Sequence, residues 1–166
     1  MKVFSVAFFC ISALLLTGCF STSEPRKIET KLEQGVQVSE AELAKTGEAY
    51  LRQVVAALEK NDHAKFTEHN IPEYNRMVTK EVFRKIAEDF RKTHGKMGEP
   101  QYLGCINKYS GKILLWKVIF ERTPFVNEQL KKSGHDPAKI PQTDSLVRMM
   151  LGKTDKGWKI IRVEIQ

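Results

Sequence analysis

The spacing of apolar residues changes at Gly95, and this change constrains the fold more than any other feature of the chain. Before Gly95, apolar residues recur every three or four positions, which is typical of helices that bury one face. After Gly95, short apolar runs are separated by turn residues, which indicates strands. Helices followed by strands, without alternation of the two, predict an α+β domain with an antiparallel sheet.

The sequence predicts three helices before Gly95. Ser39 and Glu42 form a capping-box pattern at the start of the first helix, whose apolar stripe continues to Leu58. Asp62 is suited to cap a short second helix. We expect Pro72 to end that helix, because proline disfavours the helical conformation in the residue before it.

The third predicted helix begins after Thr79. Val78 and Phe83 have the spacing of a hydrophobic staple, in which an apolar residue before the cap packs on one inside the helix. Gly95 is suited to the left-handed position just past the end of this helix.

Four strands are predicted after Gly95, at residues 101–107, 112–122, 145–151 and 158–165. The second strand is apolar on both faces, so we expect it to be central and covered on both sides. Residues 123–143 form a long connection, for which we expect a surface excursion with one helical turn. The alternative is a flap held down by apolar side chains, namely Phe125, Val126, Leu130 and Ile140.

The N-terminal segment resembles an export signal. Lys2 supplies a positive charge, residues 3–16 form an apolar run, and Leu16-Thr17-Gly18-Cys19 resembles the lipobox of bacterial lipoproteins. The resemblance implies cleavage before Cys19 and transfer of palmitate-type acyl chains to its thiol. It also implies the cell envelope, and Phe20 in place of Asp favours the periplasmic face of an outer membrane. The alternative is an uncleaved anchor, since a spanning helix needs about 20 apolar residues.

These features divide the chain into a signal peptide (1–18), a lipidated tether (19–38) and a single α+β domain (39–166). The tether is polar and has no sustained apolar period, so it cannot bury enough surface to order itself. Cys105 is the only thiol left unmodified after cleavage and acylation, which excludes an internal disulfide. It lies in an apolar strand pattern, so we expect a buried and inert thiol.

Two segments resemble nuclear-transport-factor-2-like domains, which have a cystatin-like α+β cone. They are the helical stretch at residues 49–62, Ala-Tyr-Leu-Arg-Gln-Val-Val-Ala-Ala-Leu-Glu-Lys-Asn-Asp, and residues 156–163, Lys-Gly-Trp-Lys-Ile-Ile-Arg-Val. The resemblance covers about residues 41–166. It implies three N-terminal helices packed on a curved four-stranded sheet that encloses a pocket. It does not assign a function, because that superfamily includes isomerases, dehydratases and binding modules.

No catalytic constellation is present in the sequence. A Gly-x-Ser-x-Gly elbow, a glycine-rich phosphate loop and the His or Cys spacings of zinc sites are all missing. We therefore predict no catalytic residue, metal or cofactor. We expect the histidines to be solvated loop or helix-end residues, namely His63, His69, His94 and His135.

Lys117 and Arg148 are the two charged residues embedded in apolar strand runs. Each is a candidate anion-recognising group in a pocket. The alternative is that each side chain points outward and lays its aliphatic stem along the sheet.

The net charge of +7 becomes +6 after cleavage, because Lys2 is the one charged residue in the signal peptide. Basic and acidic residues are interleaved, which is typical of a solvated surface. We expect no nucleic-acid partner for an exported protein. The candidate partners are the membrane, through the lipid anchor, and a small apolar or anionic ligand or an envelope protein.

The sequence thus favours a membrane-anchored envelope lipoprotein with a non-enzymatic ligand- or protein-binding domain. Two alternatives stay open: a small pocket enzyme of isomerase, dehydratase or hydrolase type, and a scaffold component of an envelope complex.

Overall fold

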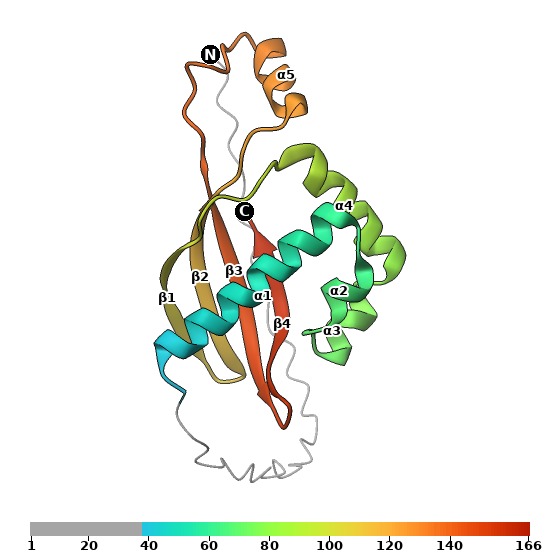
Figure 1. Ribbon diagram of the computed structural model, residues 1–166, viewed down its shortest axis with the longest axis vertical. Coiled ribbons are helices and arrows are strands. Elements are labelled where there is room, and N and C mark those ends of the chain that lie inside the picture. Colours follow the sequence, from blue (N-terminus) through green and yellow to red (C-terminus); the bar gives the residue numbers. More distant parts are fainter. Residues whose placement is uncertain (1–37) are drawn as a thin grey trace, which may run out of the picture. The chain divides into compact units, whose positions relative to one another are not determined.

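The computed structural model describes residues 38–166, in which helices lie along one face of a four-stranded antiparallel sheet (Figure 1). The strands follow the order of the sequence: β1 (Gln101–Lys108), β2 (Gly111–Ile119), β3 (Asp144–Thr154) and β4 (Gly157–Ile165). The helices are α1 (Glu40–Lys60), α2 (His63–Thr67), α3 (Pro72–Met77), α4 (Lys80–Thr93) and α5 (Pro124–Lys132). The α+β class and the antiparallel sheet are confirmed. The predicted signal peptide, Cys19 and all of the tether except Val38 lie outside the described residues.

The first helix begins as the sequence predicts. The Glu42 backbone N–H donates to Ser39 Oγ (3.2 Å), and the Ser39 N–H donates to the Glu42 carboxylate (3.1 Å), which completes the capping box. Gly47 faces the sheet, where a Cβ atom would overlap the side chains of Leu114 and Trp116. The absence of a side chain at Gly47 therefore lets α1 approach β2 closely.

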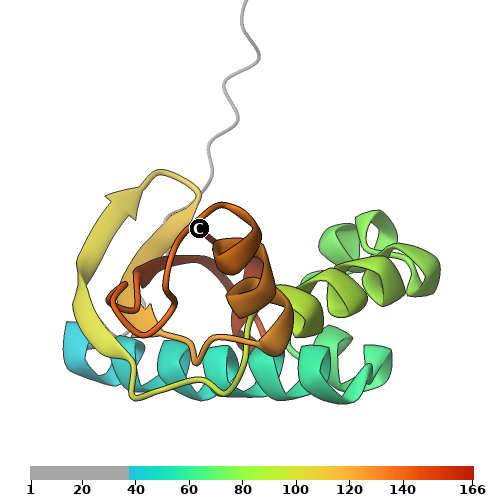
Figure 2. The same ribbon diagram turned by 90° about the horizontal axis from the view of Figure 1, so that it is seen from above.

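The core lies between α1 and the central strands. Both views show α1 crossing one face of the sheet (Figures 1 and 2). On that inner face Leu114, Trp116, Val147 and Met149 are each 0% exposed. The buried core residues of the described chain run from Leu43 to Ile160, so residues 38–166 contain a hydrophobic core of their own. None of the helices in this described part has the length and apolar character needed to cross a membrane.

Residues 38–166 contain four helices before the sheet, where the sequence predicts three. Pro72 does not end a helix; it occupies the first turn of α3, where its missing N–H has no intrahelical partner to lose. The segment before α3 instead pairs with β4: the Ile71 N–H donates to the Ile160 carbonyl (2.9 Å), and the Ile160 N–H donates to the His69 carbonyl (2.7 Å).

The start of α4 is as predicted, but its end differs. The Thr79 hydroxyl accepts from the Val82 N–H (3.4 Å), and Val78 and Phe83 are both buried, as the staple pattern requires. The residue after α4, His94, is extended, and Gly95 is not in the left-handed region. A different contact requires glycine at position 95. Its N–H donates to the Glu121 carbonyl (2.8 Å), and a Cβ would clash with that same backbone.

The outer face of the sheet, which points away from α1, is less covered than predicted. Ile113 on β2 is 9% exposed, but Ile119 on the same face is 40% exposed. The expected cover on both sides of β2 is therefore wrong at this end of the strand, because no element of the described chain packs over it.

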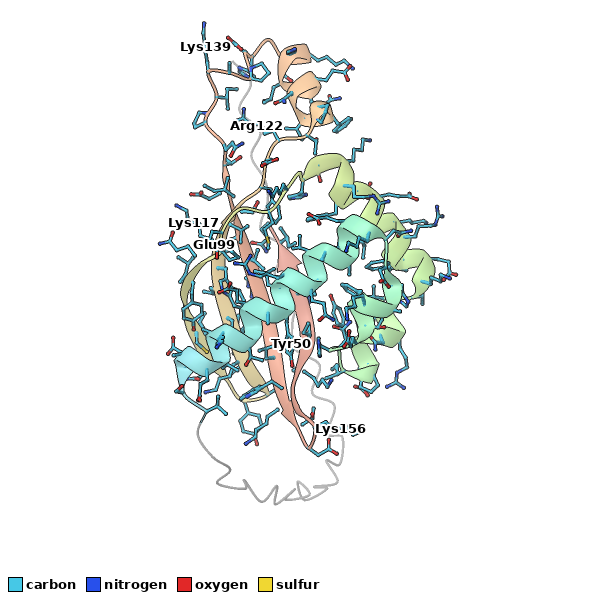
Figure 3. The ribbon with its side chains drawn as sticks, in the orientation of Figure 1. Tyr50, Glu99, Lys117, Arg122, Lys139 and Lys156 are labelled. Atoms are coloured by element: carbon cyan, nitrogen blue, oxygen red, sulfur yellow. The ribbon has the colours of Figure 1, made fainter. Side chains whose placement is uncertain are left out.

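The connection at residues 123–143 contains α5, a nine-residue helix in place of the single predicted turn. Arg122 holds the rest of this segment by donating to the backbone carbonyls of Pro137 (2.8 Å), Ile140 (2.6 Å) and Pro141. Figure 3 shows Arg122 where the segment leaves the sheet. The Thr123 hydroxyl donates to the Lys92 carbonyl (2.6 Å), which ties the start of α5 to the end of α4.

Candidate functional site

An apolar groove of about 340 Å³ lies between α4 and the edge strand β4, and we call it the α4–β4 groove. Its floor and walls come from α1, α2, α3, α4 and β4. In Figures 1 and 2 both α3 and α4 lie beyond the β4 edge of the sheet. The apolar lining residues are Val54, Leu58, Phe66, Ile86, Phe90, Val163 and Ile165, and the polar ones are Tyr74, Asp89, Thr93 and His94.

The groove exists because α4 packs on α1, α2 and α5 and leaves the edge strand partly uncovered. Phe83, Ala87 and Phe90 are the buried residues of α4, and they join the same core as α1. Val163 and Ile165 on β4 are only half-buried. Apolar side chains that face a partly filled gap are typical of small-molecule sites, whose volumes start at about 300 Å³.

His94 lies at one end of the groove. Its ring stacks on Phe90 (centroids 4.7 Å apart, planes 7° apart) and meets the edge of Phe120 at 4.9 Å. Its Nδ1 atom is 2.8 Å from the Thr93 hydroxyl. Burial lowers the pKa of His94, so the imidazole is neutral at neutral pH.

Tyr74 reaches the groove from α3. Burial raises the pKa of its hydroxyl, an effect that a hydrogen bond with the Val163 backbone opposes. The phenol is therefore neutral and places one polar group against the exposed edge of β4.

Asp89 contributes the one carboxylate of the groove lining. Among residues 38–166 it has no ion-pair partner. Its neighbour Glu88 points elsewhere and pairs with Arg84 (3.0 Å).

Lys117 and Arg148 do not line the α4–β4 groove. Both alternate with inward residues of 0–1% exposure, so strand geometry places them on the outer face of the sheet. Lys117 Nζ pairs with Asp144 (2.9 Å), and Figure 3 shows Lys117 on the β1–β2 side. Arg148 Nη1 pairs with Glu164 (3.3 Å), and both residues line a shallow hollow of about 160 Å³ on this outer face.

A larger hollow of about 780 Å³ opens between the end of α1 and the start of α4. Charges of both signs line it, including Lys60 and Lys80 as well as Asp62 and Glu81. Both carboxylates already interact with helix starts. Asp62 accepts a hydrogen bond from the Lys65 N–H at the start of α2. Glu81 lies in the first turn of α4, where hydrogen bonds with its own backbone N–H and with Thr79 lower its pKa. Among the described residues that line this hollow, only Ala64 and Phe83 are apolar, so it has a more polar and more highly charged lining than the α4–β4 groove.

All four histidines lie in loops or at helix ends, as predicted, but three of them are partly buried against aromatic rings rather than solvated. His69 stacks on Tyr50 (4.3 Å), and His63 is tilted against Phe83 (5.4 Å). His135 is exposed. For His94 the sequence held a signal, since position 94 is four residues after Phe90 and so extends the apolar stripe of α4.

Cys105 is half-buried on the inner face of β1, and burial raises the pKa of its thiol, as expected for an inert cysteine. Within residues 38–166, no three His, Cys, Asp or Glu side chains gather where a metal ion could bind.

No protein-family model and no curated protein matches the chain. Solved structures with a similar arrangement include an NTF-2-like protein of unknown function from Shewanella oneidensis, with 8% identity, 73% of this chain and 96% of that chain covered, and a TM-score of 0.45. A cystatin-like domain of unknown function from Nostoc punctiforme has 13% identity, 78% of each chain covered and a TM-score of 0.45. A SEC-C motif containing protein from Rhodopseudomonas palustris has 20% identity, 70% and 76% covered, and a TM-score of 0.44.

Proposed function

We propose that this chain is a lipid-anchored cell-envelope protein whose folded domain binds a small apolar ligand in the α4–β4 groove without catalysing a reaction. The anchoring half of the proposal rests on the sequence Leu16-Thr17-Gly18-Cys19 after an apolar run. The binding half rests on one observation: an apolar groove of about 340 Å³ beside an incompletely covered edge strand.

The groove offers a ligand more apolar than polar surface. Seven of its eleven lining residues are aliphatic or phenylalanine side chains. Burying apolar ligand area against them contributes roughly 25 cal/mol per Å² before the costs of association. The polar groups at Tyr74, Asp89, Thr93 and His94 are few and are suited to orienting a ligand.

Binding is tested with the neutral dye N-phenyl-1-naphthylamine, whose fluorescence rises in apolar sites. The protein is the unacylated chain, residues 19–166 with Cys19→Ser, because an acyl anchor would form micelles that take up the dye. Ile86→Asn should weaken dye binding, since Ile86 lines the groove. The matched control is Val82→Asn: Val82 lies one turn earlier on α4, has nearly the same exposure (42% against 43%) and does not line the groove. Equal loss in the two variants would contradict the proposal.

The anchor is tested by labelling cells with a clickable fatty acid. Cys19→Ala should abolish labelling and leave the precursor uncleaved, while Cys105→Ala should keep full labelling. Undiminished labelling of Cys19→Ala would remove the lipoprotein assignment.

An enzymatic role at the same groove is the second candidate, and His94 is the observation that favours it. A general base is usually oriented by a further group, often a carboxylate. Within the described residues the partner of His94 Nδ1 is the Thr93 hydroxyl, and no carboxylate contacts the ring. The binding role is therefore better supported. Cleavage of p-nitrophenyl acetate that is lost in His94→Gln would reverse this order.

A scaffold role is favoured by the outer face of the sheet, where large apolar side chains are exposed. Ile106 is 47%, Ile119 is 40% and Leu146 is 37% exposed. Light scattering at increasing concentration tests self-association. A mass that stays at the monomer value at every concentration would show that this face does not bind a second copy of the chain.

A further inference from the structure

The polar lining of the α4–β4 groove carries one formal charge, and that charge is negative. Asp89 supplies the carboxylate, Tyr74 and Thr93 supply hydroxyls, and His94 supplies a neutral imidazole. Among residues 38–166, no lysine or arginine is part of the lining. An anionic ligand head would therefore find no cation in the groove to pair with.

Three basic residues next to the groove lining in the sequence are engaged with other groups. Arg91 Nη1 donates to the Leu58 carbonyl (2.9 Å), and Lys92 Nζ lies over the ring of Phe125, 4.2 Å from its centroid. Arg162 Nε pairs with Glu164 at 2.6 Å. These contacts leave the carboxylate of Asp89 without a cationic partner in the described part of the chain.

Aromatic rings supply a second attraction for a cation. Phe66, Tyr74 and Phe90 all line the groove, and the face of an aromatic ring attracts an ammonium group within about 6 Å. The same rings offer apolar surface to the body of a ligand. One groove therefore combines a place for an apolar body with a carboxylate and aromatic rings for a positive head.

We infer that the α4–β4 groove selects small ligands with an apolar body and a cationic ammonium head over ligands with the same body and an anionic head. This inference rests on the proposed function, because it names the ligand class of the same groove. Without residues 1–18, and so without Lys2, the net charge falls from +7 to +6 and stays positive. A general field from this chain would favour the anion, so a preference for the cation has to come from the groove.

The test is displacement of N-phenyl-1-naphthylamine from the unacylated chain by decylammonium and by decyl sulfate, both below their micelle-forming concentrations. The two amphiphiles share one alkyl tail and differ in the charge of the head. Decylammonium should displace the dye at a concentration about three- to tenfold lower, as expected for one exposed ion pair and a cation–π contact.

Asp89→Asn should lower this ratio to the smaller preference that the aromatic rings alone provide, because it removes the ion pair. The matched control is Glu88→Gln, which removes the neighbouring carboxylate of α4 that pairs with Arg84 outside the groove. Glu88→Gln should keep the full ratio.

Equal displacement by the two amphiphiles, or stronger displacement by decyl sulfate, would overturn the inference. The proposed function would still stand in that case, because the dye itself would bind. An equal fall of the ratio in Asp89→Asn and Glu88→Gln would also overturn the inference. The preference would then depend on the total charge of α4 and not on the carboxylate in the groove. Failure of the dye to bind at all would remove the proposed function, and the inference with it.

Discussion

The helices cover the inner face of the sheet completely over the central strands β2 and β3, but incompletely at the edge strand β4. Under α1, Trp116 on β2 and Met149 on β3 are 0% exposed. At β4, Val163 and Ile165 face the same side but remain half-buried beside the α4–β4 groove. Both regions have apolar residues on strands of the same sheet, but β2 and β3 are central strands and β4 is an edge strand. The helices above them also differ, and so helix placement helps to decide whether apolar strand residues make a core or line an open groove.

The contrast predicts a large difference in free energy of unfolding between the two regions. Trp116→Ala should destabilise the domain by about 3–5 kcal/mol, because it empties the fully packed region. Trp116 Nε1 has no hydrogen-bond partner among the described residues, so this loss comes from packing alone. Val163→Ala should cost less than about 1 kcal/mol, since its methyl groups are only partly removed from water.

Urea unfolding followed by far-UV circular dichroism measures both changes. A cost below about 1 kcal/mol for Trp116→Ala would show that the α1-covered region is not the main core. A cost for Val163→Ala as large as that for Trp116→Ala would show that the groove is filled rather than open.

A smaller effect should appear in acid. Burial lowers the pKa of His69 and of His94 below the unfolded value of about 6.5. As the pH falls through about 6.5, the unfolded chain therefore binds more protons than the folded chain, and stability decreases. The loss begins near pH 6.5 and continues until the folded histidines are protonated.

His94→Phe keeps a ring to stack on Phe90 but removes this titration from the groove region. Its stability should fall less steeply than that of the wild type between pH 6.5 and pH 5. The control is the same pair of proteins at pH 8, where their difference in stability should no longer change with pH. An unchanged slope in His94→Phe would mean that His94 does not protonate on unfolding in this range.

The comparison also separates what the sequence could predict from what it could not. Local signals succeeded: the Ser39 capping box, the Thr79 cap with its Val78 and Phe83 staple, and all four strands follow from residues close together in the chain. Pro72 and Gly95 were misassigned because each residue suits two local roles. Pairing of Ile71 with Ile160 and of Gly95 with Glu121 decides between those roles, and both pairings are distant in sequence.

The groove could not be predicted, because it depends on where α4 sits relative to β4. Val163 and Ile165 look like ordinary core residues in the strand pattern, and His94 looks like a helix-end residue. Lys117 and Arg148 stood out in the sequence as charges in apolar runs. The structure places them on the outer face of the sheet, where Asp144 and Glu164 pair with them.

The groove's role is measured at residue level by nuclear magnetic resonance. The unacylated chain, labelled with ¹⁵N, is titrated with N-phenyl-1-naphthylamine, and amide shifts are followed. The proposal predicts shifts concentrated at Ile86, Phe90, Val163 and Ile165, with little change at Ile106 and Ile119 on the outer face of the sheet. Shifts concentrated at Ile106, Ile119 and Leu146, or no saturable shifts at all, would contradict a ligand site in the α4–β4 groove.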